Sequence, residues 1–347
     1  MNKINNIQGL RGIAVLLVAF SHLLLIEKKY GGNSIIPEFV LFGVSGVDLF
    51  FVISGFVMVT ITREKFRKPM EALKFIYHRV IRIYPVYWIY SVLVLIVFLI
   101  QPSWVNSAQG NQVDIVSSFL LLPSNNLPLV NVGWSLVHEV YFYLFFFLIM
   151  LLIPEWFLAL TLTLWAGVLV FAHIFCELNN LYLNFVFHPL TLEFIGGCFL
   201  AIFYYHYEIK CNRKVLLVIA VVNFILLIAG HEVAHIISAV YTSAWWWRIL
   251  TFGVPSLLIV HCFVHLERDA YILPKWLIAI GDASYSIYLS HVLVLSALGR
   301  IWYVFSSNGV MDNIVAIPVL TALMLSFGLV SYHMLEKPIM KVFRKIA

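Results

Sequence analysis

The chain has 347 residues, of which 62% are hydrophobic and only 11% carry a charge. An ordinary soluble domain is about one quarter charged, so this composition excludes a large soluble domain. The formal net charge of +5 is explained by the loop charges of a membrane protein, and no nucleic-acid partner is needed to account for it.

Apolar segments of about 20 residues, the length with which a helix crosses a bilayer, recur from one end of the sequence to the other. Ten such spans are predicted, near residues 7–27, 41–62, 83–101, 132–153, 156–176, 185–205, 214–230, 246–265, 284–305 and 314–335. The sequence therefore predicts an all-α integral membrane protein with about ten transmembrane helices.

The positions of the Lys and Arg residues indicate how these spans are oriented. If the N-terminus is cytoplasmic, only Lys28 and Lys29 of the 22 Lys and Arg fall in outside loops, and the longest outside loop, 102–131, has none. Such an asymmetry is typical of the positive-inside rule. We therefore expect both termini on the cytoplasmic side of a multi-pass protein of the cell (inner) membrane.

Ionisable side chains inside the spans are the first candidates for function, because burying charge in a bilayer is costly. His22 follows Arg11 by eleven residues, which on a helix places it within about 20° of the same azimuth and about 16 Å nearer the outer surface. Arg11 could instead extend to the lipid headgroups, and His22 could be a hydrogen-bonded packing residue. Both interpretations of each residue stay open on this evidence.

Two carboxylates lie in the same outer half of the predicted membrane domain as His22. Asp48 in GVDLFFVISGF is about 10 Å below the outer edge of the second span, and Glu139 in WSLVHEVYFY is about 12 Å below that of the fourth. Either carboxylate could orient His22, or could instead form a structural bond to a Ser, Tyr or backbone group. Ser135, one turn before Glu139 on the same face, is a candidate partner of this kind.

A second polar layer is predicted at the cytoplasmic face. Arg79 and Arg82 in YHRVIRIYPVYW lie on one side of a helical turn, just before Pro85, where a membrane helix could begin or kink. They either follow the positive-inside rule or clamp a phosphorylated ligand with bidentate guanidinium groups. Arg248 and Arg300, near the ends of their spans, are expected to reach the lipid headgroups.

Two further motifs add polar side chains to the cytoplasmic layer. In GDASYSIYLSH, Asp282 lies at the inner end of the ninth span, and Tyr285 and His291 follow it into the membrane. YHMLEKP places His333 and Glu336 at the inner end of the tenth span.

Taken in chain order, these stretches resemble the acyltransferase 3 family of integral membrane acyltransferases, which includes O-acetylases of surface polysaccharides. The resemblance runs from Gly9 to Pro338. It rests on the spacing of Arg11 and His22 and on the motifs GVDLFFVISGF, HRVIRIYPVYW, WSLVHEVYFY, GDASYSIYLSH and YHMLEKP. Each motif is weak alone, but their order on ten spans is specific.

The resemblance implies an acyl-CoA donor, most simply acetyl-CoA, engaged from the cytoplasm as a co-substrate. No tightly bound cofactor and no metal are expected. It implies an acceptor hydroxyl on a carbohydrate, either an extracytoplasmic polysaccharide or a lipid-linked glycan. Matching positions give His22 the catalytic role and place Arg11, Arg79 and Arg82 near the donor. We expect residues 1–347 to form a single transmembrane acyltransferase domain, without the extracytoplasmic hydrolase-like domain that many relatives append.

The resulting hypothesis gives the candidate residues separate roles. His22 takes the proton from the acceptor hydroxyl or accepts the acyl group itself. Asp48 or Glu139 orients His22 and stabilises the imidazolium, as further catalytic residues. The remaining candidates for substrate binding are Trp134, Ser135, Tyr285 and His291.

Two other functions fit parts of the sequence. A proton-coupled secondary transporter would also place polar residues such as Arg11 and Glu139 inside the membrane, but no pair of matching halves is found. The stretch HEVAH, residues 231–235, has the histidine spacing of zinc hydrolases, but no expected third ligand follows it. The sequence favours O-acyl transfer over both.

Overall fold

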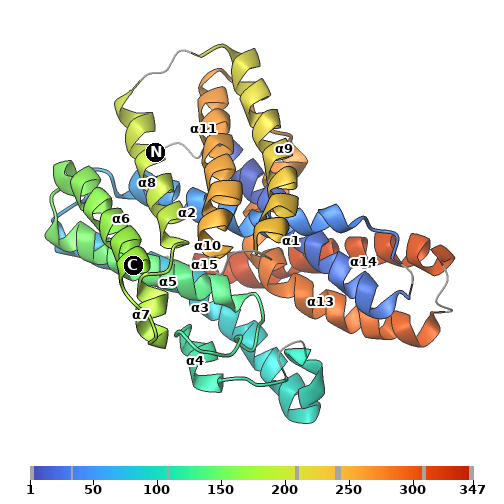
Figure 1. Cartoon of the computed structure of the whole chain (residues 1–347). Helices are drawn as coiled ribbons and strands as arrows, with labels where there is room; N and C mark the ends of the chain where they lie inside the picture. The colour runs from blue at the N-terminus through green and yellow to red at the C-terminus, as the bar shows by residue number, and fades with distance from the viewer. Residues whose placement is uncertain are drawn as a thin grey trace. The chain divides into compact units, whose positions relative to one another are not determined.

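The protein is built from helices that are long enough to span a membrane (Figure 1). The computed structural model describes residues 4–32, 34–107, 110–207, 211–238, 244–306 and 310–343. Every regular element in these ranges is a helix. Ten helical segments of this described part are long and apolar enough to cross a bilayer, so the predicted all-α class and the number of spans are confirmed. The cytoplasmic location of the termini stays a prediction.

Several of the ten segments combine two or three consecutive helices. In chain order they are α1 Asn5–Tyr30; η1 Glu38–Ser45 with α2 Gly46–Thr62; α3 Pro69–Ile100; α5 Gly133–Leu152; η4 Glu155–Phe157 with α6 Leu158–Phe175; α7 Leu181–Val186 with α8 Thr191–His206; α9 Arg213–Ser238; α10 Ala244–Arg248 with η5 Ile249–Gly253 and α11 Val254–Arg268; α13 Ser284–Phe305; and α14 Val310–Ser331 with η6 Tyr332–Glu336 and α15 Lys337–Phe343. Three shorter helices lie between spans: η2 Pro102–Trp104, α4 Ile115–Leu120 and α12 Lys275–Asp282. The elements η5 and η6 are π-helical.

The third span begins earlier than the sequence predicts. Helix α3 begins at Pro69, well before residue 83, and continues through Pro85. Proline at the first helical position is favourable because that position has no intrahelical N–H bond to lose. Hydropathy marks only the part of a helix that lies in hydrocarbon, whereas backbone hydrogen bonding continues beyond it. Arg79 and Arg82 therefore lie within a continuous helix.

The chain folds into two compact units. Unit 1 comprises Met1–Val57 and Gly196–Tyr332, and unit 2 comprises Met58–Ile195 and His333–Ala347. Helices α2 and α8 each contribute residues to both units. The expected single acyltransferase domain stays a prediction.

Unit 1 is organised around α1. This helix packs against α12, α13, η1 and α11, and α13 in turn packs along α14, as Figure 1 also shows for α13 and α14. A buried apolar cluster joins α1, α13 and α14; it consists of Ala19, Leu23, Leu295, Leu320 and Met324. The N-terminal span is thus a central element of its unit.

Two glycines allow α1 and α12 to approach closely. A Cβ atom at Gly281 would lie 1.7 Å from the carbonyl oxygen of Gln8, and one at Gly12 would lie 2.3 Å from that of Leu277. Both distances are far below van der Waals contact, so any side chain at either position would force the helices apart. Small residues have this role in helix pairs of membrane proteins.

Unit 2 contains α3, which packs on α5 and on α15. Its interior is rich in aromatic rings, and the ring of Phe142 stacks on those of Trp165 and Phe194 at centroid distances of 5.9 and 4.5 Å. Stacked aromatic side chains fill large volumes with few rotatable bonds. They hold α5, α6 and the start of α8 together.

A buried carboxylate ties the end of α1 to α14 in unit 1. Glu27 is fully buried, and its Oε1 accepts hydrogen bonds from the Ile35 N–H at 2.7 Å and from Asn313 Nδ2 at 2.9 Å. Its Oε2 accepts bonds from the Ser34 hydroxyl and the Ile36 N–H, both at 3.0 Å. Each oxygen thus serves two donors, which compensates for the burial of the charge.

We expect Glu27→Gln to destabilise the protein by about 1–3 kcal/mol. In either orientation of the amide, its NH2 group faces a backbone N–H that then has no acceptor. The measurement is thermal unfolding of purified protein in detergent. Glu38→Gln is the matched control, because Glu38 pairs with Lys28 at the surface and its side chain is 78% exposed. Equal melting temperatures for the two variants would contradict the assignment.

Candidate active site

Helix α1 carries both Arg11 and His22, as the sequence predicts. It is continuous from Asn5 to Tyr30, so Arg11 and His22 share a face and are separated by about 16 Å along the axis. Both side chains are partly buried. The predicted shared helix face is confirmed, whereas the side of the membrane that each residue is nearer to, and the roles of both, stay predictions.

The ring next to His22 is that of His291, on α13. The distance between His291 Nε2 and His22 Nδ1 is 3.4 Å, and the ring centroids lie 4.9 Å apart at an angle of 74°. His291 is fully buried, whereas His22 is partly accessible. The structure therefore joins a motif of the first span to a motif of the ninth.

Backbone contacts assign the tautomer of each ring. His22 Nδ1 lies 2.9 Å from the carbonyl oxygen of Val18, and His291 Nδ1 lies 2.7 Å from that of Tyr288. A carbonyl can only accept, so we assign the proton of each neutral ring to Nδ1. The lone pair of His291 then faces the Nδ1–H of His22, which is shared with Val18. The lone pair of His22 is on Nε2, for which the described residues offer no partner.

The ring of Tyr288 packs next to the buried histidine. The ring of Tyr288 lies 5.7 Å from that of His291 and 5.8 Å from that of Phe50 on α2. All residues of α13 from Ser284 to His291 are buried. Tyr285 belongs to this buried stretch, so it is part of the packed base of α13; its role in substrate binding stays a prediction.

Asp48 forms a buried ion pair with Arg248. Arg248 Nε donates to Asp48 Oδ1 at 2.9 Å, and its Nη2 donates to Oδ2 at 2.8 Å. The side chains are 19% exposed for Arg248 and 0% for Asp48. The expectation that Arg248 reaches the lipid headgroups is wrong, because its guanidinium is bound in two places by a carboxylate. The role of Asp48 in orienting His22 stays a prediction.

Local helix geometry accompanies this ion pair. Arg248 is the last residue of α10 and immediately precedes the π-helix η5. A π-turn inserts one extra residue into a helix and rotates the following residues, and such turns are frequent at functional sites. The sequence carries no obvious signal for this irregularity. Counting residues gives the depth of Asp48 and Arg248 along their helices but does not predict that they pair.

In unit 2, Glu139 accepts a short hydrogen bond from the hydroxyl of Tyr143, one turn further along α5. The guanidinium carbon of Arg79 lies 5.7 Å from the centre of the Tyr143 ring. Ser135 donates to the carbonyl oxygen of Val132 at 3.0 Å. Tyr143 is thus a partner that the sequence analysis missed, although its i, i+4 spacing from Glu139 could have revealed it.

Two other candidate residues of unit 2, Trp134 and Arg82, lie on α5 and α3. The ring of Trp134 is 6.2 Å from that of His138, which in turn contacts His188 at 4.7 Å. Arg82 lies on α3 one turn after Arg79. The proposed contributions of Trp134, Ser135, Arg82 and Glu139 stay predictions.

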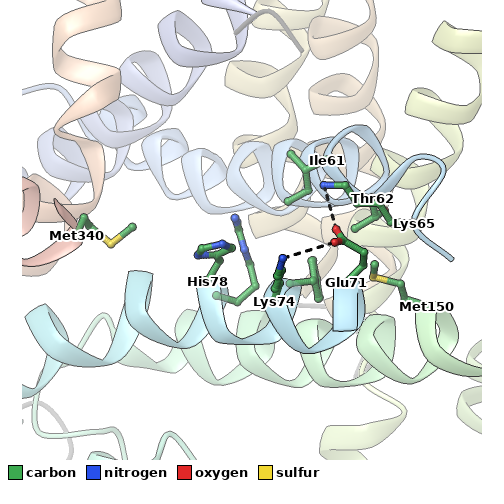
Figure 2. A pocket seen from close by; sticks show the side chains of 10 residues that line it. Ile61, Thr62, Lys65, Glu71, Lys74, His78, Met150 and Met340 are labelled. Carbon is green, nitrogen blue, oxygen red and sulfur yellow. Dashed lines mark ion pairs between the residues drawn. The ribbon is translucent and has the colours of Figure 1, made fainter. Parts of the chain in front are cut away.

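Unit 2 also contains an open cavity of about 500 Å³ with a basic lining (Figure 2). Its walls are Ile61, Thr62, Lys65, Glu71, Lys74, Phe75, His78, Arg79, Met150 and Met340. The sequence analysis found Arg79 as a candidate for phosphate binding but missed Lys65, Lys74 and His78. In the sequence these residues look like ordinary members of a positively charged loop and helix start.

The HEVAH stretch lies in α9. His231 and Glu232 are described, whereas the side chain of His235 lies outside the described residues. Among the residues that the structure describes, no group of three or more His, Cys, Asp or Glu side chains could hold a metal ion.

The helices and their polar clusters define a multi-pass membrane protein, and its family follows from comparison with known proteins. A family model described as an acyltransferase domain matches residues 4–333, so the chain belongs to the acyltransferase 3 family. The exopolysaccharide production protein ExoZ of Rhizobium meliloti is 26% identical over 86% of this chain and 90% of its own length. The O-acetyltransferase OatA of Staphylococcus aureus is 24% identical over 96% of this chain, which spans 57% of OatA. No solved structure matches.

Breaking the buried ion pair between Asp48 and Arg248 is expected to destabilise the protein. Asp48→Asn and Arg248→Gln should each destabilise the protein by about 3–5 kcal/mol, because each leaves a buried charge without its counter-charge. The double variant should be destabilised by less than the sum of the two single effects, since it removes both charges. Unfolding by denaturant in detergent measures this coupling. Lys28→Gln is the control, because it breaks an exposed pair with Glu38 and should change stability by less than about 1 kcal/mol.

Proposed function

We propose that the protein is an O-acyltransferase of the inner membrane that moves an acyl group, most simply acetyl, from cytoplasmic acyl-CoA to a hydroxyl of a carbohydrate. The acceptor is an extracytoplasmic polysaccharide or a lipid-linked glycan. Membership of the acyltransferase family supports the reaction class. The names of the relatives, an exopolysaccharide production protein and an O-acetyltransferase, support the acceptor class and the bond formed.

One observation carries the chemical part of this proposal: His22 is partly accessible, and its Nδ1 is held by Val18 and His291. These contacts leave the lone pair of Nε2 for the substrate. Nε2 accepts the proton of the acceptor hydroxyl while the oxygen attacks the thioester carbonyl. The C–S bond then breaks, and Nε2–H returns the proton to the departing sulfur, which leaves an ester and free CoA.

His291 is a positioning residue in this scheme. Its Nε2 accepts a hydrogen bond from His22 Nδ1–H, so it fixes the ring and stabilises the imidazolium that forms after proton transfer. It does so without adding a buried negative charge. The same geometry serves the alternative in which His22 Nε2 itself accepts the acyl group and then passes it on.

The remaining candidates have supporting roles. Arg11, on the same helix face as His22, holds the anionic or carbonyl part of the donor. Arg79 and Arg82 bind donor phosphates, for which a guanidinium is well suited. Asp48 or Glu139 is the carboxylate assigned to stabilising the imidazolium. Trp134, Ser135 and Tyr285 are assigned to substrate contacts, to be tested one by one.

A transfer assay tests the roles of the two histidines. Purified protein in detergent is incubated with labelled acetyl-CoA and a candidate glycan, without any ion gradient. His22→Ala should lower kcat by about 10²- to 10⁴-fold, the usual contribution of a general base. His291→Phe should lower kcat more than it changes KM, and His291→Gln should restore part of the rate because its amide oxygen can accept the bond.

His206→Gln is the matched control for these variants. His206 also lies on a helix of unit 1, and its Nδ1 is 2.8 Å from the carbonyl oxygen of Ile202, but its side chain is exposed. Its rate should equal that of the parent protein. An active, folded His22→Ala protein would overturn the assignment. Product formed without a gradient excludes a pure transporter, the alternative class of function for this chain.

A further inference from the structure

The basic cavity of unit 2 has one carboxylate among its lining residues, that of Glu71. Its Oε2 lies 3.9 Å from Lys65 Nζ and its Oε1 lies 3.9 Å from Lys74 Nζ. Figure 2 draws both ion pairs of this carboxylate as dashed lines. One anion thus faces two cations, and each contact is at the outer limit of an ion pair.

These contacts are easily exchanged. The Lys65 and Lys74 side chains are 47% and 50% exposed, and that of Glu71 is 33% exposed. Ion pairs of this kind contribute about 0–1 kcal/mol, because water competes for both partners and the long side chains lose entropy. An anion with more charge and more acceptor oxygens than a carboxylate should therefore displace Glu71 from both lysines.

The rest of the lining also favours an anion. Lys65, Lys74 and Arg79 outnumber the single carboxylate, and His78 adds a further donor. A phosphate offers several acceptor oxygens to such a set of donors. The cavity of about 500 Å³ is in the range of small-molecule sites, roughly 300–1,000 Å³.

We propose that Glu71 is a resident competitor for the phosphate groups of the donor. In the free protein its carboxylate occupies the position between Lys65 and Lys74 that a donor phosphate takes on binding. This inference rests on the proposed function and adds a regulatory element to it. The competition lowers the affinity for the donor and equally for CoA, which carries the same phosphates, so the product is released rather than retained.

Binding measurements test this exchange with the full chain in neutral detergent. The probes are CoA and adenosine 3′,5′-bisphosphate, titrated by calorimetry at low and high salt. Glu71→Gln should tighten binding of both probes about five- to tenfold, because the lysines no longer have a competing charge. Lys65→Gln and Lys74→Gln should each weaken binding by a similar factor. All affinities should fall with salt.

Two substitutions outside the cavity lining are the matched controls. Glu64→Gln removes one negative charge from the loop that precedes α3, and Lys68→Gln removes one positive charge there; Lys68 Nζ donates to the Glu64 carbonyl oxygen at 2.7 Å. Both should bind the probes as the parent protein does. If Glu71→Gln binds no tighter than Glu64→Gln while the parent protein binds CoA, the inference about Glu71 is wrong and the proposed function stands.

Two other outcomes concern the proposed function itself. If the parent protein binds neither probe, the assignment of this cavity to the donor fails together with the role of Arg79. Phosphatidylglycerol headgroups carry the same phosphate chemistry, so anionic lipid is titrated into the micelles as a second arm. Association of that lipid, tightened by Glu71→Gln in the absence of any nucleotide binding, would overturn the donor assignment in favour of a lipid site.

Discussion

The fold depends on the requirement that a polar side chain in apolar surroundings must find its partner within the protein. Glu27, Asp48 and His291 are fully buried, and each binds a group that is distant in sequence. An unpaired polar group costs several kcal/mol in hydrocarbon, so these contacts select one arrangement of helices over others that would bury the same apolar area. The apolar side chains fill the space between helices, whereas the polar contacts determine which helix faces which.

In the proposed function, a second histidine takes the place of the carboxylate that usually orients a general base. In a Ser-His-Asp triad a buried carboxylate orients the imidazole, and that carboxylate needs its own donors. Here the acceptor is a neutral ring whose proton is bound by the carbonyl of Tyr288, so no further buried charge must be stabilised.

The basic residues of the cavity are of a kind that also determines membrane orientation. Lysines and arginines at the ends of spans orient a membrane protein during insertion. Lys65, Lys74 and Arg79 are of this kind, yet they line a cavity with a single carboxylate among its walls. The proposed binding of donor phosphates would use basic side chains that the positive-inside rule already favours on one side of the membrane. In the sequence, Lys65 and Lys74 are fully accounted for by the positive-inside rule, so they did not stand out as candidates for binding.

The sequence by itself determined the ten spans, the helical class and the shared face of Arg11 and His22, because hydrophobic length and helical spacing are properties of a continuous stretch of chain. The depth of Asp48, Glu139 and His22 along their helices could be counted in the same way. Only the tertiary structure decided that His291 lies next to His22 and that Arg248 binds Asp48. Depth in a bundle follows from counting residues, whereas adjacency depends on the rotation of each helix about its axis. Close approaches such as that of Gly12 and Gly281, and irregularities such as the π-turn after Arg248, fix that rotation through packing between distant segments.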